Sequence, residues 1–296
     1  ARCDIALGSV ALVDSCTVFT GGKQIRRRPA GPIIDALNAR GAKVESTRNN
    51  GAAPIIVRGP VLGGRIELDG SKTSQYLTSL LINCPLAQGD TTINVTHLVE
   101  KPYVEITLRW LKEQGIWVEN HGFERFVIPG CQSYQPFDKP IAADFSSATF
   151  FMCAAAITGS KLTLEGLDPQ DTQGDRAVVD MLREMGADVE WRVESGESRD
   201  LVEVRGGDLK GTTLDLSDTP DALPALAVTA CFAEGETRLV NVPQARLKET
   251  DRIAVMHEEL SKMGADIEEL PDGLVIRGRP LHSAVVNGHY DHRVIM

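Results

Sequence analysis

The chain has 296 residues, 42% hydrophobic and 24% charged, which is typical of a globular protein long enough for two domains. Its formal net charge of −10 argues against a nucleic-acid-binding protein, because such proteins expose a basic face. It contains no run of 18 apolar residues, so we expect no membrane-spanning segment.

The six cysteines are widely spaced, and no two lie within four residues of one another. This spacing predicts neither a metal-binding knuckle nor a redox pair. The first residues resemble neither a signal peptide nor a transit peptide. We therefore expect reduced cysteines in a cytoplasmic protein.

In chain order, residues 5–13 are typical of the end of a buried helix. Four segments with one apolar side follow, and each predicts a helix that ends at a glycine. They lie around residues 33–37, 104–111, 178–185 and 256–263, before Gly41, Gly115, Gly186 and Gly264. After each glycine come a short β-branched strand and a second strand that closes on Gly59, Gly130, Gly206 or Gly278.

A second kind of helix, rich in alanine and leucine, is expected after each polar turn of the pattern. These inner helices are predicted at residues 76–82, 148–157 and 223–232, and a fourth should follow His292. The repeat of about seventy residues therefore predicts an α/β protein built from β-α-β-α-β-β units in two packed layers.

A proline-rich segment, Gln135–Pro140, interrupts the pattern between the second and third units. Two prolines in six residues are typical of a crossing between domains. We place the boundary near Ile141, which gives domains at residues 1–141 and 142–296.

The densest polar cluster runs from Arg246 to Arg252 and carries five charges in seven residues at a helix start. One interpretation is a solvated capping region; the other is an anion site with a carboxylic acid beside it. Lys248 and Arg252 are four residues apart and would point together on a helix. The free N–H groups of the helix start favour anions, and Glu249 among cations suits proton transfer.

Three further polar clusters, at residues 71–75, 218–221 and 291–293, open the inner helices of three units. Taken singly, each is explained by ordinary helix capping, with Asp221 as an N-cap. The repeat places them at equivalent helix starts, which would face shared space. A cleft lined by helix N-termini is electropositive and suits phosphates and carboxylates.

The segment 246–256 (Arg-Leu-Lys-Glu-Thr-Asp-Arg-Ile-Ala-Val-Met) resembles the signature of the 5-enolpyruvylshikimate-3-phosphate (EPSP) synthase family. Further segments agree with the family in the same order, so that the resemblance covers essentially the whole chain. They are residues 98–103, 132–134, 144–148, 173–175 and 291–293.

The resemblance implies a two-lobed enolpyruvyl transferase fold with three units in each lobe, of which about four of six are present. Residues 1–141 would be the later part of lobe one, and 142–296 the first part of lobe two. It implies transfer of the enolpyruvyl group of phosphoenolpyruvate to the 5-hydroxyl of shikimate 3-phosphate, on the route to chorismate and aromatic amino acids. Small-molecule substrates, no metal or organic cofactor, no nucleic acid or membrane and a monomeric state are implied as well.

The resemblance also implies roles for individual residues. Asp221 would accept the 5-hydroxyl proton, Glu249 would protonate the methylene carbon, and His292 would support the site. Shikimate 3-phosphate would be bound by Thr73, Ser74, Gln75, Gln244 (where an Asn is common), Lys248 and Asp221, with Tyr103 near its ring. Phosphoenolpyruvate would be bound by Arg28, Arg252 and Arg293, and also touched by Gln75.

The chain departs from the family pattern in four places. A substrate-cradling Lys-Ser segment and a late lysine would fall outside residues 1–296, so we expect an incomplete chain with little activity alone. Asp4 stands where the family has an arginine, and Glu100 stands where it has a phosphate-binding serine. Because a carboxylate about 4 Å from a phosphate costs roughly 1–4 kcal/mol, Glu100 either turns away or removes that contact.

Two alternative functions are compatible with the same fold. One is a UDP-N-acetylglucosamine enolpyruvyl transferase, which the Lys248–Arg252 segment disfavours. The other is a non-catalytic binding protein, with Asp4 and Glu100 as signs of relaxed constraint.

Overall fold

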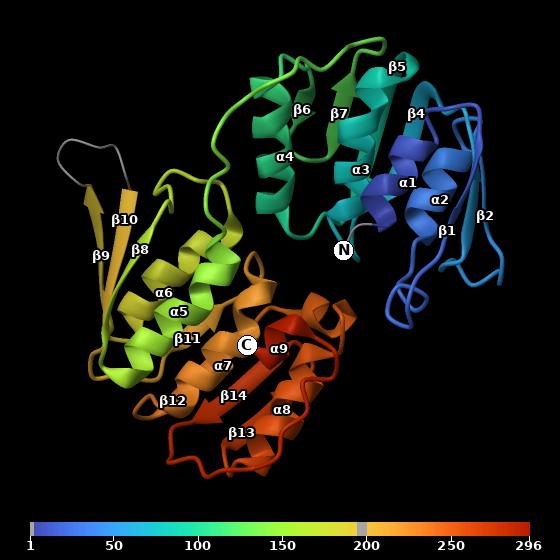
Figure 1. The fold of residues 1–296 in the computed structure, drawn as a ribbon. Coiled ribbons are helices and arrows are strands. Elements are labelled where there is room, and N and C mark those ends of the chain that lie inside the picture. Colours follow the sequence, from blue (N-terminus) through green and yellow to red (C-terminus); the bar gives the residue numbers. More distant parts are fainter. Residues whose placement is uncertain (1–2, 194–199) are drawn as a thin grey trace. The chain divides into compact units, whose positions relative to one another are not determined.

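The computed structural model describes residues 3–193 and 200–296. The chain divides into two compact units, Ala1–Lys139 and Pro140–Met296 (Figure 1). The domain boundary expected from the sequence lies near Ile141. No helix in the described part of the chain is long and apolar enough to cross a membrane.

The first unit contains two sheets. Antiparallel strands in the order β1-β3-β2 form one, and the order β4-β5-β7-β6 forms the other, in which only β4 and β5 are parallel. The elements are α1 (Cys3–Val10), β1 (Cys16–Phe19), α2 (Gly31–Asn38), β2 (Lys43–Ser46), β3 (Ile55–Arg58), β4 (Leu62–Asp69), α3 (Gln75–Asn83), η1 (Cys84–Leu86), β5 (Gln88–Thr96), α4 (Lys101–Glu113), β6 (Glu119–His121) and β7 (Arg125–Ile128).

The second unit repeats this plan, with sheets in the orders β8-β10-β9 and β11-β12-β14-β13. Its elements are α5 (Phe145–Thr158), β8 (Lys161–Glu165), η2 (Gly174–Ala177), α6 (Val178–Glu184), β9 (Asp188–Val193), β10 (Asp200–Arg205), β11 (Thr213–Asp215), η3 (Pro220–Ala222), α7 (Leu223–Cys231), β12 (Glu236–Val240), η4 (Pro243–Leu247), α8 (Arg252–Lys262), β13 (Asp266–Leu270), β14 (Gly273–Arg277) and α9 (His292–Ile295).

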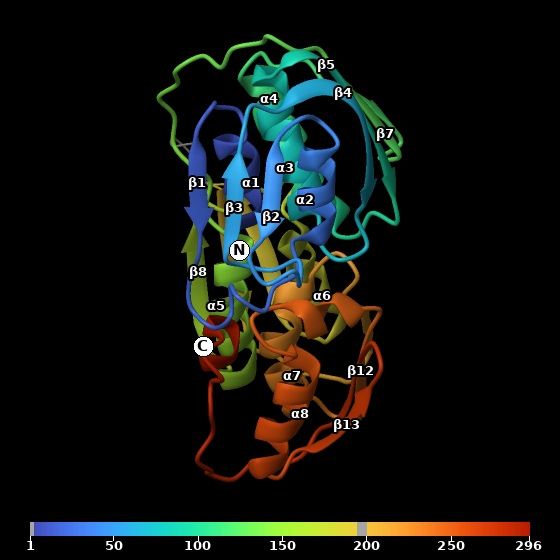
Figure 2. The same ribbon diagram turned by 90° about the vertical axis from the view of Figure 1, so that its right-hand side faces the viewer.

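The predicted β-α-β-α-β-β unit is confirmed twice in full, from β4 to β7 and from β11 to β14. The same order runs from α1 to β3 and from α5 to β10, starting at the inner helix. Burial alternates along β2 and β12, so each sheet has one covered face. Figure 2 shows helices of the first unit between its two sheets.

The helix-ending glycines adopt the conformation that the sequence predicts. Gly41, Gly115, Gly186 and Gly264 have φ values of +95°, +71°, +99° and +84°. This left-handed region is open to glycine and strained for other residues, and it terminates a helix by turning the chain away from it.

The strand-closing glycines share a second constraint, which the repeat alone did not explain. A Cβ at Gly59, Gly130, Gly206 or Gly278 would lie 1.7 to 2.3 Å from a backbone atom. For Gly59, Gly206 and Gly278 that atom belongs to Val13, Gly159 and Ala233, one to three residues after the end of the inner helix, and for Gly130 it belongs to Gly89 in β5. The glycine therefore lets the end of the last strand pass close to the chain that follows the inner helix.

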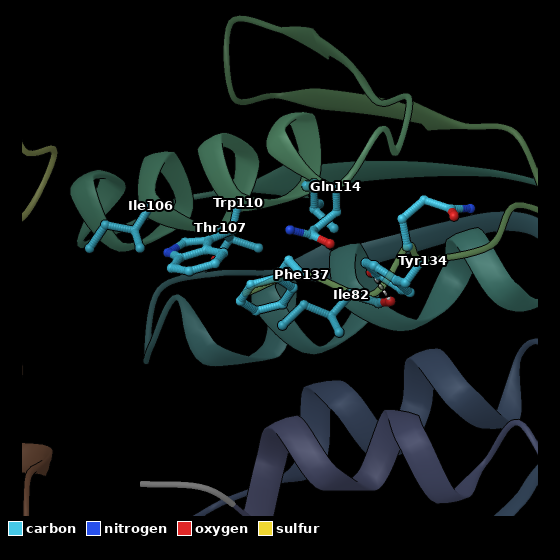
Figure 3. A pocket seen from close by; sticks show the side chains of 9 residues that line it. Ile82, Ile106, Thr107, Trp110, Gln114, Tyr134 and Phe137 are labelled. Atoms are coloured by element: carbon cyan, nitrogen blue, oxygen red, sulfur yellow. Dashed lines mark hydrogen bonds between the residues drawn. The ribbon is translucent and has the colours of Figure 1, made fainter. Parts of the chain in front are cut away.

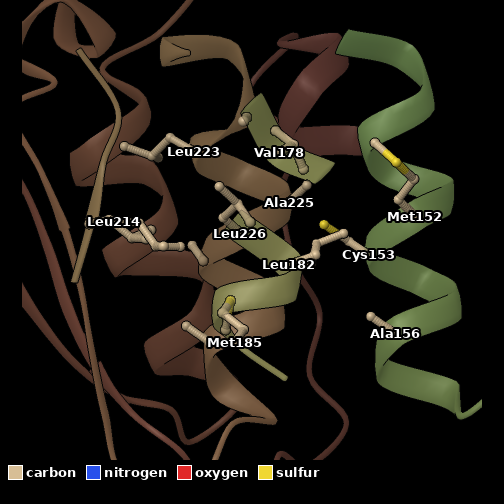
Figure 4. Packing of buried hydrophobic residues seen from close by; sticks show 14 of the residues in the cluster. Met152, Cys153, Ala156, Val178, Leu182, Met185, Leu214, Leu223, Ala225 and Leu226 are labelled. Carbon is tan, nitrogen blue, oxygen red and sulfur yellow. The ribbon is translucent and has the colours of Figure 1, made fainter. Parts of the chain in front are cut away.

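The inner helices form the centre of each unit's hydrophobic core. Every residue of α7 except Val228 is buried, and α5 and α3 are buried along most of their length. In Figure 4, Met152 and Cys153 of α5 lie on the side of that helix toward Leu182 of α6 and Ala225 of α7. Helices buried on most sides are what their alanine-rich sequences predicted.

We predict that Gly278→Ala destabilises the second unit by about 1–3 kcal/mol, because the new methyl group would overlap the carbonyl oxygen of Ala233. Gly31→Ala is the matched control, since a Cβ there meets nothing within 4 Å. Urea unfolding measures both. Equal midpoints for the two variants would contradict the packing role of Gly278.

Candidate active site

A buried guanidinium organises the polar centre of the second unit. Arg252, the first residue of α8, is 1% exposed. Its Nε and Nη2 donate to the two oxygens of Asp291 at 2.8 and 3.2 Å. Its Nη1 donates to Asp221 Oδ1 at 2.7 Å, and its Nη2 also donates to Glu249 Oε2 at 2.9 Å. One arginine thus joins three carboxylates from three segments of the chain.

Helix capping positions two of the residues that surround this guanidinium. Asp291 caps α9 by accepting from the Arg293 N–H at 2.9 Å, and it is completely buried. Asp251 caps α8 by accepting from the Ala254 N–H at 3.1 Å. Aspartate is among the preferred N-cap residues, so short local signals fix the start of α8 at Arg252 and the start of α9 at His292, one residue before Arg293.

Asp221 does not act as the helix cap that was one of the two interpretations of its sequence. No side-chain capping bond starts η3 or α7. Its second oxygen, Oδ2, lies 3.6 Å from Arg293 Nη2. Burial raises the pKa of Asp221, but the charges of Lys248, Arg252 and Arg293 outweigh burial and hold that pKa below its usual value. Asp221 is therefore a carboxylate able to accept a proton.

Arg293 links the start of α9 to the start of α5. Its Nη1 donates to the Ser146 carbonyl at 2.7 Å and its Nη2 to the Ser146 hydroxyl, while the guanidinium lies 5.7 Å from the Phe150 ring. The starts of three inner helices, α5, α7 and α9, thus contribute to one polar centre. Within this unit, the expected gathering of equivalent helix starts is confirmed.

Lys248 and Arg252 do not share a helix, so that part of the prediction is wrong. The 3-10 helix η4 ends at Leu247, Lys248 is extended, and α8 begins only at Arg252 because Asp251 caps it. The charge of Lys248 nevertheless lowers the pKa of Asp221, which places the ammonium near that carboxylate.

Gln244 and His292 lie at the margin of this centre. Gln244 is buried and donates from Nε2 to the Ser217 carbonyl at 2.8 Å. His292 is exposed, with its Nδ1 3.9 Å from Asp291 Oδ1.

One acid beside the site was missed when the sequence was searched for chemistry. Asp175, the second residue of η2, is 3% exposed. Burial and the Asp221 charge raise the pKa of Asp175 to about 7, against the opposing effect of Arg293. Only its place in the Gln173-Gly174-Asp175 segment of the family pattern pointed to it.

In the first unit, the predicted ligands Thr73, Ser74 and Gln75 open α3. Ser74 is buried and donates to Glu100 Oε2 at 3.2 Å, so the Glu100 carboxylate faces this hydroxyl. Thr73 Oγ1 accepts from the Gln75 N–H at 3.3 Å. Among the described residues, the buried Gln75 Oε1 has no hydrogen-bond partner.

Arg28 lies near Asp4, the acid that replaces a family arginine. Asp4 is 7% exposed; burial raises its pKa, and the Arg28 charge opposes that rise. Tyr76, on α3, donates its hydroxyl to the Pro29 carbonyl next to Arg28. Tyr103, the remaining predicted ligand of this unit, is half-buried in the first turn of α4.

A cavity of about 450 Å³ in the first unit does not have the chemistry of this site. It lies along α4, with Trp110, Phe137 and Ile82 among its lining residues (Figure 3). No Asp, Glu, His, Lys or Arg side chain lines it, so it offers neither an acid–base pair nor a counter-ion for phosphate.

The contacts of the polar centre favour a cluster of internal ion pairs over a metal site. Glu249, Asp291 and His292 offer ligand atoms within 4.8 Å of one another. Arg252, however, already donates to both carboxylates. A divalent cation would have to displace that guanidinium from a buried position.

We predict that Arg252→Met destabilises the protein by about 3–5 kcal/mol, because three carboxylates then lose their shared cation. Arg252→Lys should recover only part of the loss, since an ammonium cannot reproduce the guanidinium fork. Arg277→Met is the control, because Arg277 pairs with Glu236 at the surface and its loss should leave the urea midpoint close to wild type. A wild-type midpoint for Arg252→Met would refute the organising role.

We predict that Asp175→Asn changes how stability depends on pH. A carboxyl whose folded pKa is raised to about 7 favours the folded state below pH 4, and this contribution is lost as the pH rises toward 7. The variant has no carboxyl at this position and does not lose this contribution. Its free energy of unfolding, compared with that of wild type, should therefore rise by several kcal/mol between pH 4 and pH 8, at about 1.4 kcal/mol per pKa unit. Urea unfolding over this range tests it, with the exposed Asp208→Asn as control; parallel pH curves for Asp175→Asn and wild type would contradict it.

Comparison with known proteins identifies the family. The model of the family described as EPSP synthase (3-phosphoshikimate 1-carboxyvinyltransferase) matches residues 5–296. A protein of that enzyme name from Ruminiclostridium cellulolyticum is 53% identical over 99% of this chain and 68% of its own length. One from Acetivibrio thermocellus is 54% identical over 97% of this chain and 66% of its own length.

The fold is also similar to a solved structure, that of EPSP synthase from Acinetobacter baumannii. The TM-score is 0.76 at 28% identity, over 99% of this chain and 68% of that one. The chain thus spans about two thirds of the length of the relatives it matches. From the family match, the identities and the fold, we conclude that this chain belongs to the EPSP synthase family, the 3-phosphoshikimate 1-carboxyvinyltransferases of the shikimate pathway.

Proposed function

We propose that the protein transfers the enolpyruvyl group of phosphoenolpyruvate to the 5-hydroxyl of shikimate 3-phosphate and releases phosphate. The observation that carries this proposal is the pair Asp221 and Glu249 on one buried guanidinium, that of Arg252. Addition of the 5-hydroxyl oxygen to phosphoenolpyruvate needs one proton delivered to the methylene carbon and one removed from the hydroxyl, and the pair supplies a group for each. Elimination then removes a proton from the new methyl group while the carbon–oxygen bond to phosphate breaks, and phosphate leaves.

In this proposal Asp221 is the base, and Glu249 is the acid. The lowered pKa of Asp221 keeps it ionised and ready to accept the 5-hydroxyl proton. Glu249 donates a proton to the methylene carbon, and Arg252 Nη2, 2.9 Å from its Oε2, stabilises the carboxylate that remains. Because both groups share Arg252, their distance from each other is held through one rigid planar cation.

Arg252, Arg293 and Lys248 supply the positive charges around Asp221, and such a group of cations suits an anionic substrate such as phosphoenolpyruvate. Arg293 is our main candidate for its carboxylate or phosphate, whereas Arg252 has four of its five N–H groups engaged by carboxylates of the described chain.

For shikimate 3-phosphate we propose Lys248, Gln244 and Asp221 in the second unit and Thr73 and Gln75 in the first. The unpartnered Gln75 Oε1 supports this role, since a buried amide oxygen needs a donor. The Ser74 hydroxyl already donates to Glu100, so Ser74 is a weaker candidate for a phosphate ligand. Tyr103, Arg28 and His292 keep the roles that the family resemblance implies.

We further propose that the enzyme is a cytoplasmic monomer that acts on small molecules without a metal or organic cofactor. The proposed chemistry forms one carbon–oxygen bond, breaks the carbon–oxygen bond to phosphate and transfers protons, and these steps use the named acid and base. All five cysteines whose side chains are described are free, which suits a reducing compartment.

The proposal predicts phosphate release that is slow but above the protein-free rate when the purified 296-residue chain is given phosphoenolpyruvate and shikimate 3-phosphate. Asp221→Asn and Glu249→Gln should each lower kcat by about 10²–10⁴, because each removes one positioned proton transfer. Glu268→Gln, at an exposed site on β13, is the control and should leave kcat unchanged.

Two outcomes would replace the proposal. Phosphate release with UDP-N-acetylglucosamine as acceptor, and none with shikimate 3-phosphate, would assign the chain to the sibling reaction. Calorimetric binding of shikimate 3-phosphate without turnover by the wild-type protein would instead identify a binding protein on the same fold.

A further inference from the structure

The segment from Gly278 to Asp291 connects β14 to the polar centre and contains no helix or strand. It is largely exposed, and Val285 is 95% exposed. Its last residue is Asp291, the doubly bonded partner of Arg252. The position of Asp291 therefore depends on a connection with no secondary structure of its own.

The turn just before Asp291 has a costly backbone conformation. His289 and Tyr290 have φ values of 49° and 60°, in the left-handed region that non-glycine residues rarely adopt. Two such residues in sequence persist only where surrounding contacts hold them. Tyr290 is 91% exposed, whereas His289 is half-buried and its ring lies against α8.

Glu259 of α8 provides those contacts. It is 4% exposed, its Oε2 accepts from the Asn287 N–H at 2.9 Å, and its Oε1 lies 2.6 Å from His289 Nε2. Asn287 Oδ1 in turn accepts from the His289 N–H at 2.8 Å. One buried carboxylate thus fixes both ends of the Asn287–His289 turn.

The location of Glu259 on α8 adds a second constraint. Glu259 follows Arg252 by seven residues, which is two helical turns, so the two side chains leave the same face of the helix. Arg252 holds Asp291, and Glu259 holds Asn287 and His289. Helix α8 therefore binds the segment at two points, and these two contacts fix the path of the chain between them.

The Glu259 cluster does not need an added cation. Glu258, Glu259 and His289 have ligand atoms within 4.8 Å of one another, but Lys262 Nζ already donates to Glu258 at 2.9 Å and to Glu259 at 2.8 Å. Burial opposes ionisation of Glu259, yet hydrogen bonds from Lys262, His289 and the Asn287 N–H lower its pKa to about 2. The carboxylate is therefore charged throughout the neutral range.

We infer that Glu259 is a positioning residue for the enolpyruvyl transfer: by holding Asn287 and His289, it sets the turn that places Asp291 against Arg252 and Arg293 at the phosphoenolpyruvate site. In the described part of the chain, the recorded hydrogen bonds of Glu259 go to Lys262, Asn287 and His289, so it acts through that turn. The catalytic part of this inference rests on the proposed function. The hydrogen bonds by which Glu259 holds Asn287 and His289, here called the clamp, do not depend on that function.

The test compares Glu259→Ala with Glu258→Gln. Glu258 shares the Lys262 partner and is exposed, and its carboxylate lies within 4.8 Å of His289 with no recorded hydrogen bond to residues 287–289 in the described chain, so it controls for loss of charge on α8. Hydrogen exchange of backbone amides measures the clamp, and the KM values for the two substrates measure its consequence.

In Glu259→Ala, exchange of the α9 amides of Arg293 to Ile295 should quicken about tenfold or more, as loss of a charge-assisted hydrogen bond produces. The KM for phosphoenolpyruvate should rise about tenfold, and the KM for shikimate 3-phosphate should stay within about twofold. Glu258→Gln should change none of these quantities. His289→Asn tolerates the left-handed turn but cannot reach Glu259, so it should reproduce the effect without altering α8, even if Glu259→Ala folds poorly.

Unchanged exchange in both Glu259→Ala and His289→Asn would overturn the clamp. Faster exchange with an unchanged phosphoenolpyruvate KM, or equal rises in both KM values, would overturn the positioning role. Absence of any turnover by the wild-type protein would refute the proposed function and with it the catalytic part, whereas the exchange measurement would still decide whether Glu259 holds the turn.

Discussion

The structure of the second unit depends on a single buried cation, the Arg252 guanidinium. Removing an arginine from water is costly, and here the cost is offset by four hydrogen bonds to Asp221, Glu249 and Asp291. The arrangement is reciprocal, because each of these carboxylates would be a poorly compensated charge without Arg252. Chemistry and stability therefore cannot be separated at this site: the groups proposed to move protons are also the groups that hold the elements together.

The repeated unit explains how such a centre can be assembled. The inner helices α3, α5 and α7 are largely buried, and the strand-closing glycines let the last strand of each repeat pass close to the chain that follows the inner helix. Fixing the inner helices in this way also fixes their starts. In the second unit those starts bring together Ser146, Asp221 and Arg293, and the same helix that begins with Arg252 holds the connection to Asp291 through Glu259. The same contacts therefore hold the fold together and position the residues of the site.

The acids that depart from expectation are buried and are used within the protein. Glu100 accepts from Ser74, and Asp4 lies near Arg28, so neither projects as a free charge. Asp175 is the clearest case, because burial and the neighbouring Asp221 raise its pKa to about 7. A buried acid with such a pKa changes its charge near neutral pH, beside the proposed base, and so links the ionisation of the site to stability.

The sequence by itself determined the repeat, the helix ends and the helix caps, because these depend on residues a few positions apart. Gly41 and Gly264 end helices through their own φ angles, and Asp251 and Asp291 cap helices that start beside them. The sequence also supplied the family motif. It did not predict that Asp221 binds Arg252 instead of capping a helix, that Lys248 lies outside α8, or that Asp175 faces Asp221. Only the tertiary structure decided these, since Arg252 and Asp291 are 39 residues apart, Arg293 and Ser146 are 147 apart, and burial at such contacts sets which charges pair.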